Sequence, residues 1–104
     1  MLLEVPREPV KENSFLNLNK VSSYLWKSWK DELKKEGWNW RKFLKLMSSR
    51  KNDLDSYLKG ETSWEEFVKG TLELLEGSTG KMILSFEQSF MRTRVYIKIH
   101  NAPL

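Results

Sequence analysis

The sequence contains no cysteine, a single histidine and no long apolar run. Without thiols, disulfide bonds and thiolate metal sites are excluded, and an intracellular, cytoplasmic location is favoured. With His100 as the lone imidazole, a transition-metal site would depend on carboxylates, so no metal and no other cofactor is predicted. Because no stretch of about 18 apolar residues and no secretory-signal pattern occurs, neither a membrane-spanning helix nor a membrane partner is expected.

The sequence also lacks the common catalytic motifs. It contains none of the glycine-rich phosphate-binding patterns and no serine-hydrolase pattern. The acidic pairs Asp53/Asp55 and Glu65/Glu66 lie where helices are predicted to begin, and a helix dipole favours carboxylates there. His100 lies near the end of a predicted strand, which is typical of a surface residue. The sequence therefore predicts no catalytic residue and no enzymatic activity.

The chain has 104 residues, of which 39% are hydrophobic and 12% aromatic, and this favours one domain, 1–104, with one core. The predicted fold class is α+β, mainly α: a compact bundle of three to four helices followed by a C-terminal antiparallel β-hairpin. Residues 1–18 are expected to form an extended arm, since Pro6 and Pro9 disfavour a helix. Residues 19–77 form the predicted helical part and residues 81–100 the predicted hairpin.

Two amphipathic helices are predicted at the start of the helical part. The first covers residues 20–36, with Asn19 as its N-cap and Gly37 as the left-handed residue that ends it. The second begins after Asn39, another expected N-cap. Apolar residues recur at helical spacing on one face of each helix. These residues are Val21, Leu25, Trp26, Trp29 and Leu33 in the first helix and Trp40, Phe43, Leu44 and Met47 in the second.

The remaining predicted elements are a short helix, a longer helix and two strands. A short helix around residues 54–58 is expected to be capped by Asn52 or Asp53, and a longer one begins at a capping box formed by Ser63 and Glu66. Gly70 lies inside this longer helix, where it costs about 1 kcal/mol relative to alanine and indicates a close approach by another element. Alternating apolar residues then predict two strands, 82–87 and 95–100, with a turn near residues 88–92.

The positive charge is unevenly distributed along the chain. The net charge is +4, but Lys and Arg are concentrated in residues 20–51 and after residue 81, whereas Glu is concentrated in residues 61–76. On the first helix the lysines lie opposite the apolar face, and Arg50 and Lys51 extend the basic series. Such a surface binds phosphates, although an ordinary solvated face is the alternative interpretation. The candidate nucleic-acid-binding residues are Lys20, Lys27, Lys30, Lys34, Arg41, Lys42 and Lys45, together with Arg92 and Arg94 near the predicted turn.

Two of the tryptophans are candidates for stacking on unpaired bases. Trp26 lies at the margin of its apolar face and Trp38 lies in the connector between the helices. A base stacked on an aromatic ring contributes about 1–3 kcal/mol. For both residues, burial or contact with a protein is the favoured alternative. Trp29, Trp40 and Trp64 are predicted core residues, because each falls on a helical apolar face.

These features predict a non-enzymatic, sequence-independent protein that binds the phosphate backbone of DNA or RNA, as a small subunit of a larger nucleoprotein complex with other protein subunits. In size, basic charge and helical content the chain resembles the small helical subunits of multi-protein CRISPR effector complexes, and the resemblance implies a comparable role. The alternative is a protein–protein interaction module, such as an inhibitor or adaptor, that uses the acidic helix 64–76 and the hairpin edge.

Overall fold

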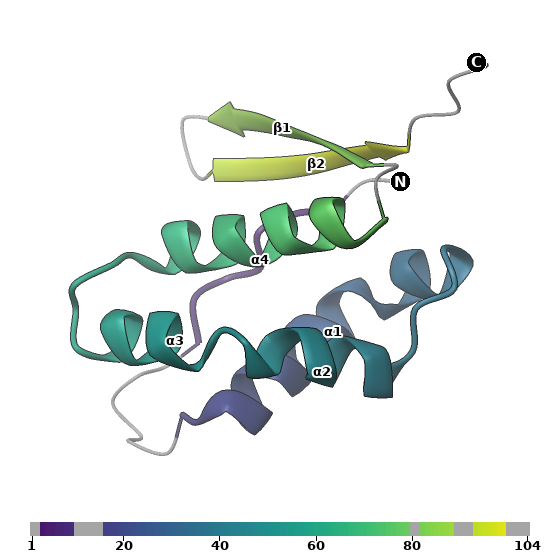
Figure 1. Ribbon diagram of the computed structural model, residues 1–104. Helices are drawn as coiled ribbons and strands as arrows, with labels where there is room; N and C mark the ends of the chain where they lie inside the picture. The colour runs from purple at the N-terminus through teal and green to yellow at the C-terminus, as the bar shows by residue number, and fades with distance from the viewer. Residues whose placement is uncertain (1–2, 10–15, 80–81, 89–92, 100–104) are drawn as a thin grey trace.

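The computed structural model describes residues 3–9, 16–79, 82–88 and 93–99, with the two strands described as backbone. Figure 1 shows how the elements of these ranges are arranged. The elements are α1 Leu18–Lys35, α2 Trp40–Ser48, α3 Lys51–Leu58, α4 Trp64–Thr79, β1 Met82–Gln88 and β2 Thr93–Ile99. The prediction of a mainly helical fold with a compact bundle of three to four helices is confirmed, since the described residues contain four packed helices.

Helix α1 begins at a polar cap and ends at a glycine. The side-chain oxygen of Asn17 accepts a hydrogen bond from the backbone N–H of Lys20 at 2.9 Å, so Asn17 is the N-cap. The prediction of Asn19 as the N-cap is wrong, because Leu18 packs against the core and the helix therefore starts earlier. At the other end Gly37 has φ +84°, which is the left-handed conformation predicted for it.

Helices α2 and α3 follow each other with a short turn between them. Asn39 caps α2 as predicted, since its side-chain oxygen accepts from the N–H of Lys42 at 2.8 Å. Helix α3 has no side-chain cap, so the predicted cap at Asn52 or Asp53 is wrong. The residue at the N-cap position is Arg50, whose side chain is buried in the molecule instead of bonding to the helix end.

Helix α4 starts at the predicted serine. The hydroxyl oxygen of Ser63 accepts from the N–H of Glu66 at 3.1 Å, which satisfies one of the first backbone donors of the helix. The helix continues past residue 77, the predicted end of the helical part, and ends at Thr79. Gly77 is therefore a helical residue.

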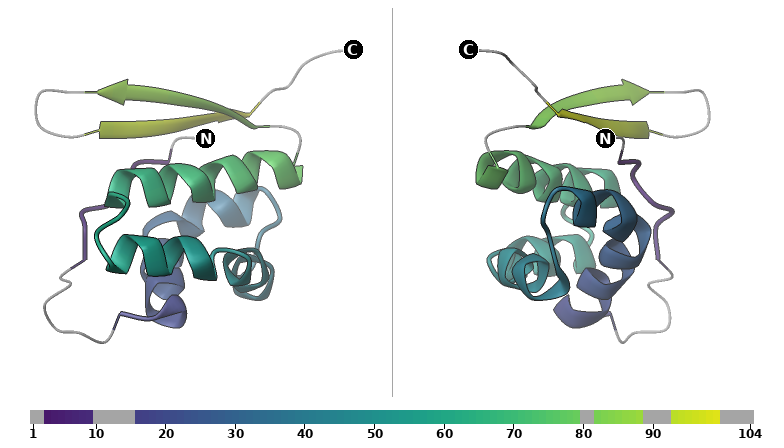
Figure 2. Two further views of the ribbon diagram at one scale, coloured as in Figure 1. Left: turned by 60° about the vertical axis from the view of Figure 1, so that its left-hand side comes forward. Right: turned by 90° about the vertical axis from the view of Figure 1, so that its right-hand side faces the viewer.

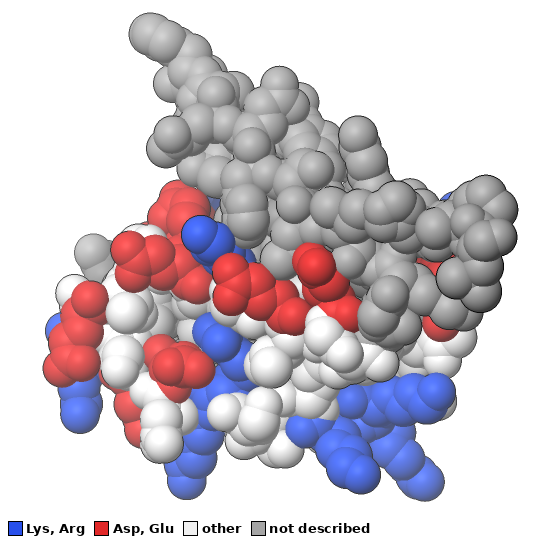
Figure 3. Space-filling model, turned by 45° about the horizontal axis from the view of Figure 1, so that its top comes forward, with Lys and Arg blue, Asp and Glu red and all other residues white. Residues whose placement is uncertain are grey.

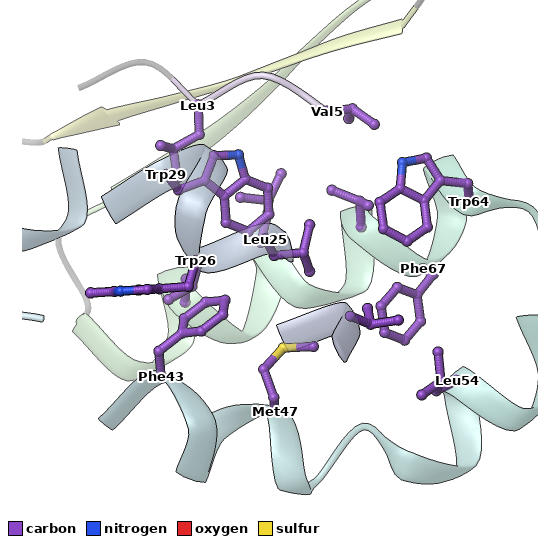
Figure 4. Packing of buried hydrophobic residues seen from close by; sticks show 14 of the residues in the cluster. Leu3, Val5, Leu25, Trp26, Trp29, Phe43, Met47, Leu54, Trp64 and Phe67 are labelled. Atoms are coloured by element: carbon purple, nitrogen blue, oxygen red, sulfur yellow. The ribbon is translucent and has the colours of Figure 1, made fainter. Parts of the chain in front are cut away.

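The core lies between the helices and the N-terminal arm, and Figure 4 shows much of it at close range. Trp29 and Trp64 are each 2% exposed, which confirms their prediction as core residues. The same prediction for Trp40 is wrong, because its side chain in the first turn of α2 is 37% exposed and touches the edge of the core through Trp26. The other buried hydrophobic residues are Leu3, Val5, Val21, Leu25, Trp26, Leu33, Phe43, Met47, Leu54, Tyr57, Phe67, Val68, Leu72 and Leu75.

Residues 3–9 run across the helices without regular secondary structure, and indole groups hold their backbone in place. The indole N–H of Trp29 donates to the carbonyl oxygen of Glu4 at 2.8 Å. The indole N–H of Trp64 donates to the carbonyl oxygen of Pro6 at 2.7 Å. The arm thereby gives two buried tryptophans the acceptors that buried polar groups require.

Strands β1 and β2 lie beside α4, away from α2 and α3 (Figure 2). Their backbones pair antiparallel, with Met82 opposite Ile99 and Gln88 opposite Thr93. Residues 89–92, which contain most of the predicted turn, lie outside the described residues. The hairpin as a whole therefore stays a prediction.

Candidate nucleic-acid interface

The lysines of α1 lie on its solvent-facing side. Lys27, Lys30 and Lys34 are exposed, as is Lys20 in the first turn, whereas the buried residues of the helix occupy the opposite face. Asp31 is also exposed and interrupts this face one turn after Lys27. Helix geometry therefore places the four predicted lysines of α1 along one side, with a single carboxylate among them.

Few of these cations are neutralised by the protein itself. Ion pairs join Lys35 to Glu32 at 3.6 Å and Arg50 to Asp53 at 3.3 Å. Within the ranges that the structure describes, no ion pair involves Lys27, Lys30, Lys34, Arg41, Lys42 or Lys45. Their charge is therefore available to an external anion.

The connector that follows α1 has a fixed backbone. The N–H of Trp38 donates to the carbonyl oxygen of Leu33 at 3.0 Å, and the N–H of Gly37 donates to that of Lys34 at 3.1 Å. This pair of bonds is the Schellman motif, which satisfies the last carbonyls of a helix. Asn39 then caps α2, so Trp38 is held between two capped helix ends.

A pocket of about 490 Å³ opens beside this connector. Lys42 and Lys45 of α2 bring two ammonium groups to it, and Trp38, Leu46 and Leu74 bring apolar surface. The other lining residues are Glu36, Gly37, Ser49 and Ser78. The pocket thus combines cationic and apolar surface from the connector, α2 and the last turns of α4.

The two candidate stacking residues differ in accessibility. Trp26 is 9% exposed, and its ring lies 5.5 Å from that of Phe43, measured between centroids. A base cannot lie flat on a ring that is enclosed in this way, so we retain no stacking function for Trp26. Trp38 is half-buried and lines the pocket, so part of its ring is accessible.

For the two hairpin arginines, nucleic-acid binding stays a prediction. Arg92 lies outside the described residues, and Arg94 belongs to β2, which is described as backbone. The extension of the basic series through Arg50 is wrong, because that side chain is 7% exposed.

Arg50 instead connects α3 to α4. One guanidinium nitrogen donates to the carbonyl oxygen of Phe67 at 2.8 Å, and the guanidinium carbon lies 4.6 Å from the centroid of the Phe67 ring. Burial lowers the pKa of Arg50 below its ordinary value, and the charges of Asp53 and Glu73 oppose this shift. An arginine in a protein keeps its proton, so a buried cation is held here by a carbonyl, a ring and a carboxylate.

The exposed side of α4 has the opposite charge. Glu65, Glu66 and Glu73 are exposed there, with Lys69 among them. Figure 3 shows this as a row of red side chains along α4, while the densest blue group lies at the lower right, at the end of the molecule where α1 leads into α2. On the face that Figure 3 shows, the acidic row is therefore separate from the densest group of cations.

The sequence did not predict the pocket, although two of its residues give a signal. Leu46 and Leu74 lie at the margins of the apolar faces of their helices, and Leu74 is 38% exposed. An apolar residue at such a margin indicates either the edge of the core or a surface that binds another molecule. The sequence cannot distinguish these, because α2 and α4 come together through tertiary packing.

The described residues contain no group of three or more His, Asp or Glu side chains placed to hold a metal ion. None of the helices in these ranges has the length and apolarity needed to cross a bilayer. The chain matches no protein-family model, no curated protein and no solved structure.

Proposed function

We propose that this protein is a non-enzymatic nucleic-acid-binding protein that holds the phosphate backbone of DNA or RNA without reading its sequence. The observation that carries the proposal is the exposure of cations on α1 and α2 that have no ion pair within the described part of the chain. Such cations replace the counterions around phosphates, and the released counterions drive binding. The proposed contact residues of this kind are Lys27, Lys30, Lys34, Arg41, Lys42 and Lys45. Lys20 is a further proposed contact because it is exposed in the first turn of α1.

The proposal extends to the setting in which the protein acts. It is an intracellular subunit of a larger nucleoprotein complex, and Arg92 and Arg94 of its predicted C-terminal hairpin are further proposed contacts to the phosphate backbone, separate from those of α1 and α2. The acidic side of α4 supports this arrangement, since it repels a polyanion and remains accessible to another protein. One side of the subunit then contacts nucleic acid while the other contacts protein.

The salt dependence of oligonucleotide binding tests the proposal. Contacts to about six phosphates give a slope of log K against log salt of about −4 for a single strand and about −5 for a duplex. The double substitution Lys27→Glu and Lys30→Glu removes two cations from the proposed surface of α1. It is expected to weaken binding and to make the slope shallower by about one to two units. Fluorescence anisotropy of a labelled oligonucleotide at several salt concentrations measures both effects.

A matched control separates the effect of the proposed surface on binding from the effect of the overall net charge. Lys59→Glu with Lys69→Glu changes the net charge by the same amount outside α1 and α2, at two exposed positions after α3 and on α4. This variant is expected to bind almost as well as the unaltered protein. Equal losses in the two double variants, or no binding to any oligonucleotide at low salt, contradict the proposal.

A protein–protein interaction module is the second candidate function. The observation that favours it is the exposed acidic row of Glu65, Glu66 and Glu73, next to the exposed apolar side chain of Leu74. In that case a protein partner co-purifies with the chain, and Glu65→Lys with Glu66→Lys releases it, while oligonucleotides fail to bind.

A further inference from the structure

The pocket beside the connector has a preorganised wall. Trp38 is fixed at its backbone by the bond from its N–H to the carbonyl oxygen of Leu33, and Asn39 fixes the next turn of chain. The ammonium group of Lys42 lies 3.5 Å from the carbonyl oxygen of Gly37, so this cation is directed back toward the connector. The backbone of Trp38 is therefore fixed, its side chain packs against the core, and one cation is positioned before any ligand arrives. Such preorganisation lowers the entropy that binding costs.

The chemistry of the lining selects one class of ligand. The ring of Trp38, with Leu46 and Leu74, offers apolar surface for a flat ring. Lys42 and Lys45 offer charge for a phosphate and outnumber the one carboxylate in the lining, Glu36. A volume of about 490 Å³ falls within the range of small-molecule sites and is too small for a double helix. The required ligand joins one aromatic ring to one phosphate group.

We propose that this pocket receives a single unpaired nucleotide of a single-stranded nucleic acid. The inference rests on the proposed function and names its substrate class. The base packs against Trp38 and Leu74, and the adjoining phosphate is held between Lys42 and Lys45. A base within a duplex is stacked on both faces and paired at its edge, so it cannot enter. Single strands are therefore preferred over duplexes of the same length.

The first measurement uses a mononucleotide and follows the indole N–H signals by heteronuclear NMR. Adenosine monophosphate is expected to shift the Trp38 signal, which Trp38→Phe identifies. The signals of Trp29 and Trp64 serve as internal controls, because their N–H groups are hydrogen-bonded to the N-terminal arm. Inorganic phosphate alone is expected to leave the Trp38 signal almost unchanged.

The second measurement compares single and double strands by anisotropy at one salt concentration. Leu74→Glu places a carboxylate in the pocket at an exposed position, so the core is undisturbed. The carboxylate is expected to repel the phosphate and to keep the base from stacking on Trp38, so single-strand affinity falls by about 5- to 150-fold, the range of one lost stacking contact. Duplex affinity is expected to change much less. Thermal unfolding checks that the variant is folded, and Leu74→Met keeps the apolar wall as a matched control.

The outcomes separate this inference from the proposed function. Equal affinity for single and double strands, with no shift of the Trp38 signal, contradicts the proposal that the pocket receives a nucleotide. It does not contradict binding of the phosphate backbone by α1 and α2. A shift of the Trp38 signal by dodecyl phosphate as large as that by adenosine monophosphate also overturns the nucleotide pocket, since the pocket then takes any anionic apolar molecule. Failure of every oligonucleotide to bind at low salt contradicts both the proposed function and the nucleotide pocket.

Discussion

At the scale of single residues, Arg50 and Gly70 depend on each other. A Cβ atom built on Gly70 would lie 2.4 and 2.8 Å from the two terminal guanidinium nitrogens of Arg50 and 2.9 Å from the carbon between them. These contacts are too short, so the guanidinium occupies the space that any side chain at position 70 would need. The close approach that the sequence indicates for Gly70 therefore comes from a single side chain, that of Arg50 at the start of α3.

Gly70→Ala is expected to destabilise the protein, although alanine is the better helix former. The methyl group displaces the guanidinium from the carbonyl oxygen of Phe67. Losing a hydrogen bond of a charged group costs about 1.5–3 kcal/mol, and better helix propensity returns about 1 kcal/mol. We expect a net loss of about 0.5–2 kcal/mol in the free energy of unfolding, measured with urea.

Gly77→Ala is the matched control, because a Cβ there meets nothing within 4 Å. It is expected to stabilise the same helix by up to about 1 kcal/mol. In an Arg50→Ala background, Gly70→Ala is also expected to stabilise, since the obstructing group is gone. Stabilisation by Gly70→Ala in the unaltered protein would contradict the dependence of the two residues on each other.

Tyr57 gives the protein a pH dependence in alkaline solution. Burial raises the pKa of its phenol above the ordinary value of about 10, and a hydrogen bond to Glu8 with the negative charges of Glu8 and Glu65 raises it further. The unfolded chain loses this proton near pH 10 while the folded protein keeps it. The stability that the neutral phenol contributes is therefore complete below pH 10 and declines above it.

Tyr57→Phe isolates this effect from the titration of the lysines. At neutral pH the variant is expected to be about 1 kcal/mol less stable, because the hydrogen bond of 2.9 Å from the phenol to Glu8 is lost. Above pH 10 this difference is expected to shrink by about 1.4 kcal/mol per pH unit. Urea unfolding of both proteins between pH 7 and about pH 11 measures the difference. A difference that is constant with pH would show that the phenol ionises equally in both states.

At the scale of elements, the N-terminal arm completes the helical bundle. Residues 3–9 supply backbone acceptors for Trp29 and Trp64, and the hydroxyl of Tyr24 donates to the carbonyl oxygen of Arg7. Leu3 is 1% exposed, so the arm also fills part of the core. An irregular segment of seven positions is thus fixed because buried aromatic donors need partners.

Leu3→Ala is expected to destabilise the protein by about 2–3 kcal/mol, at the lower end for a buried leucine because the arm can partly relax. The indole N–H groups of Trp29 and Trp64 are expected to exchange with solvent faster. Arg7→Ala is the control: it keeps the carbonyl oxygen that Tyr24 uses and removes only an exposed side chain, so a change within about 0.5 kcal/mol is expected. If Leu3→Ala is equally mild, the arm does not contribute to the core.

The positions of the helices could be predicted from the sequence, while several of their boundaries and contacts could not. Helical periodicity identified each apolar stripe, because burial in a bundle requires that spacing. The start of α1 was misplaced because Asn17 and Asn19 are equally good caps, and the packing of Leu18 decides between them. Arg50 was assigned to the surface because the glycine that makes room for it is distant in the sequence.

At the scale of the whole molecule, charge is separated across the fold. In the described residues no ion pair involves six cations of α1 and α2, and α4 presents an acidic row apart from the densest group of cations. These six are Lys27, Lys30, Lys34, Arg41, Lys42 and Lys45. The sequence indicated the separation, since basic and acidic residues occupy different segments. It could not indicate the pocket, because the connector, α2 and α4 meet there only after folding. A polyanion that approaches such a molecule is attracted to one side and repelled from the other.

The acidic side of α4 is expected to orient nucleic acid without contacting it. In water, a unit charge about 20 Å from a phosphate contributes about 0.2 kcal/mol, so removing two glutamate charges strengthens binding by about twofold when little salt is present. The variant that tests this combines Glu65→Gln and Glu66→Gln, both at exposed positions in the first turn of α4 and distant in sequence from Leu74. At about 150 mM salt the Debye length falls to about 8 Å, so the gain is expected to vanish. Anisotropy titrations at about 10 mM and about 150 mM salt measure both limits. A gain that persists at the higher salt would mean that the first turn of α4 lies against the nucleic acid, and the division of the surface between two kinds of partner would then be wrong.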